Sequence, residues 1–381
     1  VVSRVPLPAE ATPPAAAPLH WRDVLPRLTW PAPHVARTFA LTGCSGGDGG
    51  SGAGPTDSRG VQPPASETPV TPGTGSGDDD GLEAISGKIY QREAEYPQAV
   101  DLPLQFVTMS TGKKLSVRVT VPAHADGTPV EGTFPVILTQ AGYNTNLLSM
   151  MFMGTPGNLM LGASDPFMVK RGYVQVAVDA LGTGASEGGW ELFGEEEQIG
   201  FADMVDWANQ QPWSNGKLGV AGVSYMGISS LFAAQRRPDD IDAVFASLPM
   251  GDAMRAIVGT GGLINGLFMS KWMQITQFLS TQNVPTALAN PHYMNQLIRT
   301  TQEHADQVDR YFIPLINDAL DGASYVTYDS DFWRLRSPLE NMDKIKAPTF
   351  IFGALHDLFQ RDEPLLFEAL KRNGNDARLV I

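Results

Sequence analysis

Short apolar runs alternate with helix-like segments from about residue 100 to residue 381. Six of these runs have the nearly continuous apolar character of strands that are buried on both faces. They cover residues 134–143, 172–180, 217–224, 243–249, 348–357 and 377–381. Strands that alternate with helices predict an α/β fold built on a mostly parallel, doubly wound sheet.

The segments between these runs complete the predicted fold. Residues 102–123 alternate apolar and polar positions around a Ser-Thr-Gly turn at 110–112, which predicts an antiparallel hairpin at the edge of the sheet. Residues 195–211 place apolar side chains at helical spacing behind a run of acids, and Pro212 ends the pattern. The stretch from about 250 to 335 has no strand pattern, and we expect a helical cap inserted over the sheet.

The first 85 residues have a different character and are expected to form a leader and a linker ahead of a domain at 86–381. Residues 45–80 contain only Val61 and Val70 as large apolar side chains, too few to offset the entropy of ordering. Just before this linker, Leu41-Thr42-Gly43-Cys44 resembles the lipobox of bacterial lipoproteins. The stretch before Cys44 is proline-rich and contains Arg37, so a lipid anchor and a chance cysteine both remain open.

Composition excludes several classes of function. The chain of 381 residues carries a formal net charge of -14, which opposes binding to nucleic acid or to anionic lipid surfaces. Its one cysteine permits neither an internal disulfide nor a cysteine-based zinc site. No uninterrupted apolar run approaches the roughly 18 residues needed to span a bilayer, so we expect any membrane association to be by an anchor.

Ser224 lies where the third apolar run changes to a helical pattern. Gly222 precedes it by two residues and Gly227 follows it by three. A G-x-S-x-x-G string alone is most often a structural turn. With a strand before it and an amphipathic helix after it, the string fits the strand-to-helix turn that presents a nucleophilic serine in α/β-hydrolases. We therefore predict that Ser224 is a nucleophile.

Three stretches extend this prediction to a family. Residues 211–227 (QPWSNGKLGVAGVSYMG), 178–190 (VDALGTGASEGGW) and 328–360, which end in IFGALHDLFQ, together resemble the cocaine esterase and Xaa-Pro dipeptidyl-peptidase family of serine hydrolases. The resemblance covers about residues 100–381. It implies an α/β-hydrolase fold and an acyl esterase, amidase or Xaa-Pro dipeptidyl-peptidase that works through an acyl-enzyme, with a small ester, amide or peptide as substrate.

The resemblance also assigns roles to single residues. Ser224 corresponds to the nucleophile, and Asp357 corresponds to the acid that orients the catalytic histidine. Tyr143 matches the family's oxyanion tyrosine, whose hydroxyl joins the backbone N–H of Tyr225 in stabilising the tetrahedral intermediate. Acyl transfer through an activated serine needs neither a metal nor an organic cofactor, and we expect none.

The family's catalytic histidine follows a strand resembling residues 377–381, and the sequence stops at Ile381. None of the histidines present is a convincing base; they are His20, His34, His124, His292, His304 and His356. We therefore expect a chain that is truncated before the histidine and before the family's C-terminal β-sandwich, and that is nearly inactive as written.

Two other functions have some support in the sequence. Gly182, Gly184 and Gly188 suggest a dinucleotide site, but their spacing misses G-x-G-x-x-G by one residue. A non-catalytic surface lipoprotein that keeps the hydrolase fold for binding remains the alternative. The possible lipobox indicates a location in the cell envelope or outside the cell, with the cytoplasm as the other possibility.

Overall fold

A computed structural model describes residues 92–151, 162–263 and 265–381. The predicted leader, the linker and the possible lipid site at Cys44 lie outside the described residues. The described residues all belong to one compact unit.

Nine strands of the described chain form one sheet in the order β1-β3-β5-β4-β6-β7-β8-β9, with β2 also paired to β3. The strands are β1 (Gln98–Asp101), β2 (Gln105–Thr108), β3 (Lys114–Ala123), β4 (Phe134–Ala141), β5 (Val174–Asp179), β6 (Ser214–Val223), β7 (Ala243–Ser247), β8 (Thr349–Phe352) and β9 (Ala377–Val380). Every pair from β5 to β9 is parallel, whereas β1, β2 and β5 pair antiparallel with β3. The predicted mostly parallel sheet with an antiparallel hairpin at its edge is confirmed.

The helices join these strands and form the insertion. They are α3 (Thr145–Met151), α4 (Pro166–Val169), α5 (Glu195–Asn209), α6 (Tyr225–Arg236), α7 (Gly266–Ser280), α8 (Val284–Ala289), α9 (Met294–Gln307), α10 (Ile313–Leu320), α11 (Ser324–Thr327), α12 (Asp331–Leu335) and α13 (Asp362–Arg372). Segments of 3₁₀- or π-helix are η4 (Met254–Val258), η5 (Thr260–Gly262), η6 (Pro291–Tyr293), η7 (Val308–Phe312) and η8 (Pro338–Lys344).

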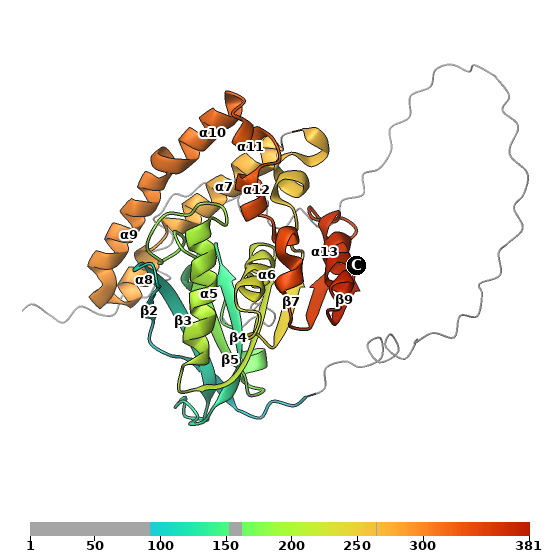
Figure 1. The fold of residues 1–381 in the computed structure, drawn as a ribbon. Helices are drawn as coiled ribbons and strands as arrows, with labels where there is room; N and C mark the ends of the chain where they lie inside the picture. The colour runs from blue at the N-terminus through green and yellow to red at the C-terminus, as the bar shows by residue number, and fades with distance from the viewer. Residues whose placement is uncertain (1–91, 152–161, 264) are drawn as a thin grey trace, which may run out of the picture. The chain divides into compact units, whose positions relative to one another are not determined.

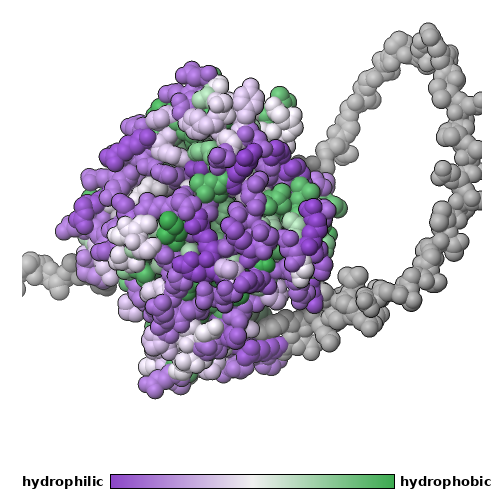
Figure 2. Space-filling view, viewed as in Figure 1, coloured by the Kyte–Doolittle hydropathy of each residue, from purple (hydrophilic) through white to green (hydrophobic). Residues whose placement is uncertain are grey.

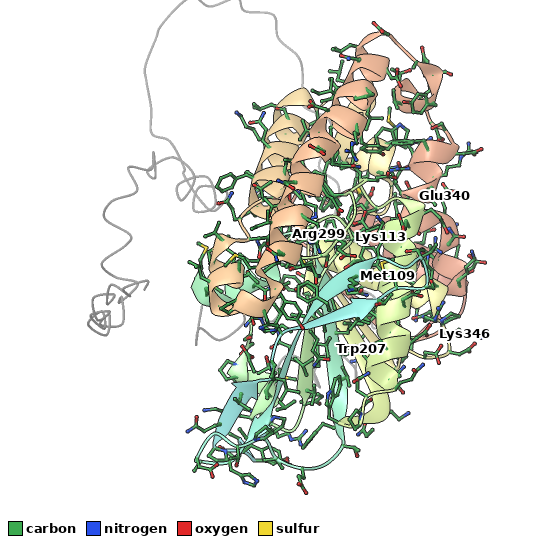
Figure 3. All side chains as sticks on the ribbon, turned by 90° about the vertical axis from the view of Figure 1, so that its left-hand side faces the viewer. Met109, Lys113, Trp207, Arg299, Glu340 and Lys346 are labelled. Atoms are coloured by element: carbon green, nitrogen blue, oxygen red, sulfur yellow. The ribbon has the colours of Figure 1, made fainter. Side chains whose placement is uncertain are left out.

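Helices α5, α6 and α13 cover one face of the sheet (Figure 1). Helix α6 is buried along nearly its whole length, because it packs against β4, β6 and β7 and also against α5. The hairpin also contacts this layer, because a Cβ atom added at Gly200 of α5 would lie 3.1 Å from the side chain of Met109. Met109 follows β2 and is labelled in Figure 3. Polar side chains cover most of the outside of this layer, with smaller apolar clusters between them (Figure 2).

The opposite face is covered only in part by the described residues. Helices α3 and α4 pack against β5, and α4 also contacts β1 and β3. Beside them, residues of β4, β6, β7 and β8 line an apolar hollow of about 1060 Å³, in which Phe245 is 37% exposed.

The stretch from residue 250 to 335 leaves the sheet after β7 and returns to it before β8. In its described part it contains helices and no strand, and these helices lie above one end of the sheet (Figures 1 and 3). We refer to α7–α12 as the cap. Asn144, which follows β4, donates from its side-chain amide to the carbonyl oxygens of Leu279 and Gln282 and so ties the cap to the sheet.

Candidate active site

The predicted site residues gather at the carboxyl edge of the parallel strands. Tyr143 follows β4, Ser224 follows β6, and Asp357 follows β8. Because parallel strands all end at the same edge of a sheet, residues that are far apart in sequence meet there. The cap lies over this edge.

Ser224 has a strained backbone. Its φ of 56° and ψ of −120° lie in a region that residues with a side chain seldom adopt, at a cost of about 1–3 kcal/mol. Bonds on both sides hold the strain, because the Ser224 N–H donates to the carbonyl of Ser247 at 2.8 Å and its carbonyl accepts from the N–H of Ile228 at 3.0 Å. The side chain is therefore held at the top of the turn and is only partly buried.

Two glycines give this turn its room. A Cβ atom added at Gly222 would collide with the side chain and backbone of Met226, in the first turn of α6. A Cβ atom added at Gly227 would lie 2.8 Å from the carbonyl oxygen of Ser247. The G-x-S-x-x-G spacing of the sequence is therefore explained by the close approach of β6, α6 and β7.

Tyr143 brings a hydroxyl group to the serine. The Ser224 hydroxyl lies within hydrogen-bonding reach of the Tyr143 hydroxyl, and the indole N–H of Trp272 donates to the same oxygen at 2.9 Å. Burial raises the pKa of Tyr143, against the effect of both hydrogen bonds. Tyr143 therefore keeps its proton near neutral pH, and Trp272, from cap helix α7, fixes the direction of its hydroxyl.

Asp357 lies in a turn after β8, so the expectation that it and His356 extend a strand was wrong. Its Oδ2 atom accepts the N–H of Phe359 at 2.9 Å, which fixes the carboxyl group at the edge of the sheet. His356 beside it is exposed. No described residue joins Asp357 to Ser224, so the acid and the serine stand at this edge without a base between them.

Behind Asp357 lies a carboxyl group that the sequence did not indicate. Glu363, in the first turn of α13, is fully buried, and neither of its carboxyl oxygens has a well-formed hydrogen bond among the described residues. Burial, together with the neighbouring carboxyl of Asp357, raises the pKa of Glu363 to about 8. Glu363 is therefore mostly protonated at pH 7 and adds no negative charge at the carboxyl edge of the sheet.

The described histidines do not supply a base. His304 is buried, and its two ring nitrogens face the carbonyl oxygens of Ser280 and Ser186 at 2.8 Å each. The side chains of His124, His292 and His356 form no hydrogen bond with Ser224 or Asp357. Within the part of the chain that the structure describes, no three metal-ligating side chains form a cluster. None of the described helices has both the length and the apolar composition of a membrane span.

Comparison with solved structures places the chain in a fold class, that of the α/β-hydrolases. A CocE/NonD family hydrolase from Staphylococcus aureus aligns over 74% of this chain and 46% of its own, with 22% identity and a TM-score of 0.52. The predicted fold class is thereby confirmed.

The family follows from the sequence. The profile of the X-Pro dipeptidyl-peptidase (S15) family matches residues 111–381, and the chain belongs to this family. The chain is 30% identical to a Mycobacterium bovis protein that is provisionally named a serine esterase. This alignment spans 185 residues and covers 46% of the chain. The chain is 24% identical over 284 residues, or 72% of its length, to the cocaine esterase of a Rhodococcus species. The chain spans 28% and 47% of these two relatives, respectively.

Glycine 222 offers a direct test of the packing at the serine turn. We expect Gly222→Ala to lower the free energy of unfolding by about 1–3 kcal/mol, as overpacking of a core does. Gly266→Ala, at the start of α7, serves as a control, because an added Cβ there meets nothing within 4 Å. Urea unfolding of the three proteins measures the difference, and equal stability of all three would contradict the packing described here.

The raised pKa of Glu363 predicts a pH-dependent stability. A carboxyl whose folded pKa is about 8, against an ordinary value of 4.5, stabilises the fold fully below pH 4.5 and loses this contribution as the pH rises towards 8. Glu363→Gln removes the loss. As the pH rises from 5 to 8, the free energy of unfolding of the wild type should fall relative to that of the variant by at least about 1.4 kcal/mol, the equivalent of one pKa unit. Glu368→Gln, exposed on the same helix, should show no such gain in denaturant titrations at the two pH values.

Proposed function

We propose that the protein is a serine hydrolase that transfers an acyl group through Ser224. The observation that carries the proposal is the strained Ser224, whose hydroxyl lies within reach of the hydroxyl of the partly buried Tyr143. Strain at a residue held by its surroundings is typical of active sites, and this turn is the one that presents the nucleophile in α/β-hydrolases. Membership of the S15 family supports the same reaction class.

In the proposed reaction, the Ser224 oxygen attacks the carbonyl carbon of an ester or amide, and a base takes the serine proton. Negative charge then develops on the substrate's carbonyl oxygen. The Tyr143 hydroxyl and the Tyr225 N–H are the donors that stabilise it. Because Trp272 donates to the Tyr143 oxygen, the phenolic proton is left to point towards the developing charge. The leaving group departs with the transferred proton, and water then hydrolyses the acyl-enzyme.

The proposed base is a histidine from outside the described residues, oriented by Asp357. The matched part covers only 28% and 47% of two relatives, which supports a contribution from sequence beyond this chain. A protonated Glu363 adds no negative charge behind Asp357, the residue proposed to orient the imidazole.

Aromatic side chains near Tyr143 favour an apolar acyl group. Trp272 packs edge-on against Trp190 with ring centroids 5.2 Å apart, and it stacks on Phe268 at 6.2 Å. These aromatic side chains suit an apolar acyl group, and the relation to a protein named cocaine esterase supports an ester as substrate. An amide or an Xaa-Pro peptide remains within the proposed substrate class.

Labelling with a fluorophosphonate tests the proposal. The protein expressed from its complete gene should be labelled on Ser224, as located by peptide mass spectrometry, and Ser224→Ala should abolish the label. Ser270→Ala, exposed on α7, should be labelled like the wild type. A folded wild type without label would favour the second candidate, a non-catalytic surface lipoprotein, which the lack of a described histidine at Ser224 already supports.

Tyr143→Phe tests the second oxyanion donor. The loss of one such donor costs about 100-fold to 1000-fold in kcat, and we expect a loss in this range with little change in KM, because the donor acts mainly on the transition state. Tyr328→Phe, a change at a highly exposed tyrosine, should leave both constants unchanged. Hydrolysis of a p-nitrophenyl ester gives both constants, and an unchanged kcat in Tyr143→Phe would remove Tyr143 from the mechanism.

A further inference from the structure

Glu197 is a buried acid in a run of exposed ones. It follows Glu195 and Glu196 in the first turn of α5, where acids usually face solvent and stabilise the helix N-terminus. Glu195 and Glu196 are exposed, whereas Glu197 is 2% exposed and points into the core. A carboxyl group in this position is costly unless its oxygens have partners.

The partners of Glu197 come from the turn that carries the serine. Its Oε1 atom accepts a hydrogen bond from the hydroxyl of Tyr225, the residue directly after Ser224. Its Oε2 atom accepts the N–H of Phe193 at 2.7 Å, and the N–H of Gly194 also points to the carboxyl group. Burial raises the pKa of Glu197 to about 8, and these donors and the charge of Arg336 oppose the rise.

The ring of Tyr225 is fixed from several sides. It stacks on Phe193 with ring centroids 4.4 Å apart and meets the Tyr143 ring edge-on at 5.8 Å. A Cβ atom added at Gly142 would lie 3.0 Å from the Tyr225 ring, so the backbone before Tyr143 rests on the ring. The Glu197 bond is the polar anchor of this cluster, because it holds the far end of the side chain.

Tyr225 therefore connects both proposed oxyanion donors. Its own backbone N–H is one of them, and its ring supports the segment that carries the Tyr143 hydroxyl, the other. We infer that Glu197 is a positioning residue, which fixes Tyr225 through its hydroxyl and thereby holds the two donors in register with Ser224. This inference rests on the proposed function of Ser224 and names a residue that the reaction needs but that does not touch substrate.

The expected effect follows from the precision that such donors need. A misplacement of about 1 Å in an active site costs on the order of 100-fold in rate. The donors act on the transition state, so the loss falls on kcat and leaves KM nearly unchanged. A residue that only stabilised the fold would change the melting temperature and leave the kcat of the folded fraction intact.

A double-mutant cycle on Glu197 and Tyr225 tests the inference. The proteins are the wild type, Glu197→Ala, Tyr225→Phe and the double variant, each expressed from the complete gene, with Glu196→Ala as the matched exposed control. Hydrolysis of p-nitrophenyl acetate gives kcat and KM, fluorophosphonate titration counts the active serines, and circular dichroism reports folding. Glu197→Gln is added because its amide oxygen still accepts the Tyr225 hydroxyl.

We expect Glu197→Ala to lower kcat by about 100-fold, Glu197→Gln to recover part of this loss, and Glu196→Ala to match the wild type. In the Tyr225→Phe variant, the added Glu197→Ala change should lower kcat far less, because the hydrogen bond between the two side chains is already absent. If Glu197→Ala does not fold, a kcat loss in folded Glu197→Gln and Tyr225→Phe supports the inference.

Two results would overturn it, and they are distinguishable. A wild type that is folded but neither labelled nor active refutes the proposed function and the inference with it. An active wild type whose folded Glu197 variants keep its kcat, or whose two losses are simply additive, refutes the role of Glu197 and leaves Ser224 in place.

Discussion

The close approach of strand β6 to helix α6 is the constraint on which the rest of the structure depends. Ser224 keeps its positive φ because the chain on both sides of it cannot move: β7 accepts its N–H, and α6 is buried along nearly its whole length. The strain is a local cost that the packing of the sheet and helix layer outweighs. Everything proposed for the chemistry of this edge assumes that this turn does not relax.

Buried carboxyl groups form a second layer behind this edge. Asp179, Glu197, Asp362 and Glu363 are almost fully buried, and burial raises the pKa of each. Three of them accept backbone N–H groups from segments near the strand ends. Asp179 accepts from the start of α3 and from the loop after β5, Glu197 accepts from the loop before α5, and Asp362 accepts from the loop after β7. Loops that must be irregular to expose functional groups thereby have their backbone donors satisfied from inside.

The sequence predicts the sheet well, because parallel strands that are buried on both faces must be nearly continuous in apolar residues. It also brings Ser224, Tyr143 and Asp357 to one edge through strand order alone. It does not separate Glu197 from its exposed neighbours, since three successive acids look alike in a helix that begins there. Trp272 was missed for another reason: 129 residues separate it from Tyr143, and no local pattern records such a contact.

The cap leaves the sheet and returns to it between β7 and β8, which are neighbours in the sheet. Its helices can therefore lengthen, shorten or change composition without altering the order of any strand. The part of the molecule that surrounds Ser224 from above is thus free to diverge, while the turn that carries the serine is held by the sheet. The cap and the serine turn are therefore separate segments of one chain, and the Trp272–Tyr143 hydrogen bond is a point where a change in the cap would reach the edge of the sheet.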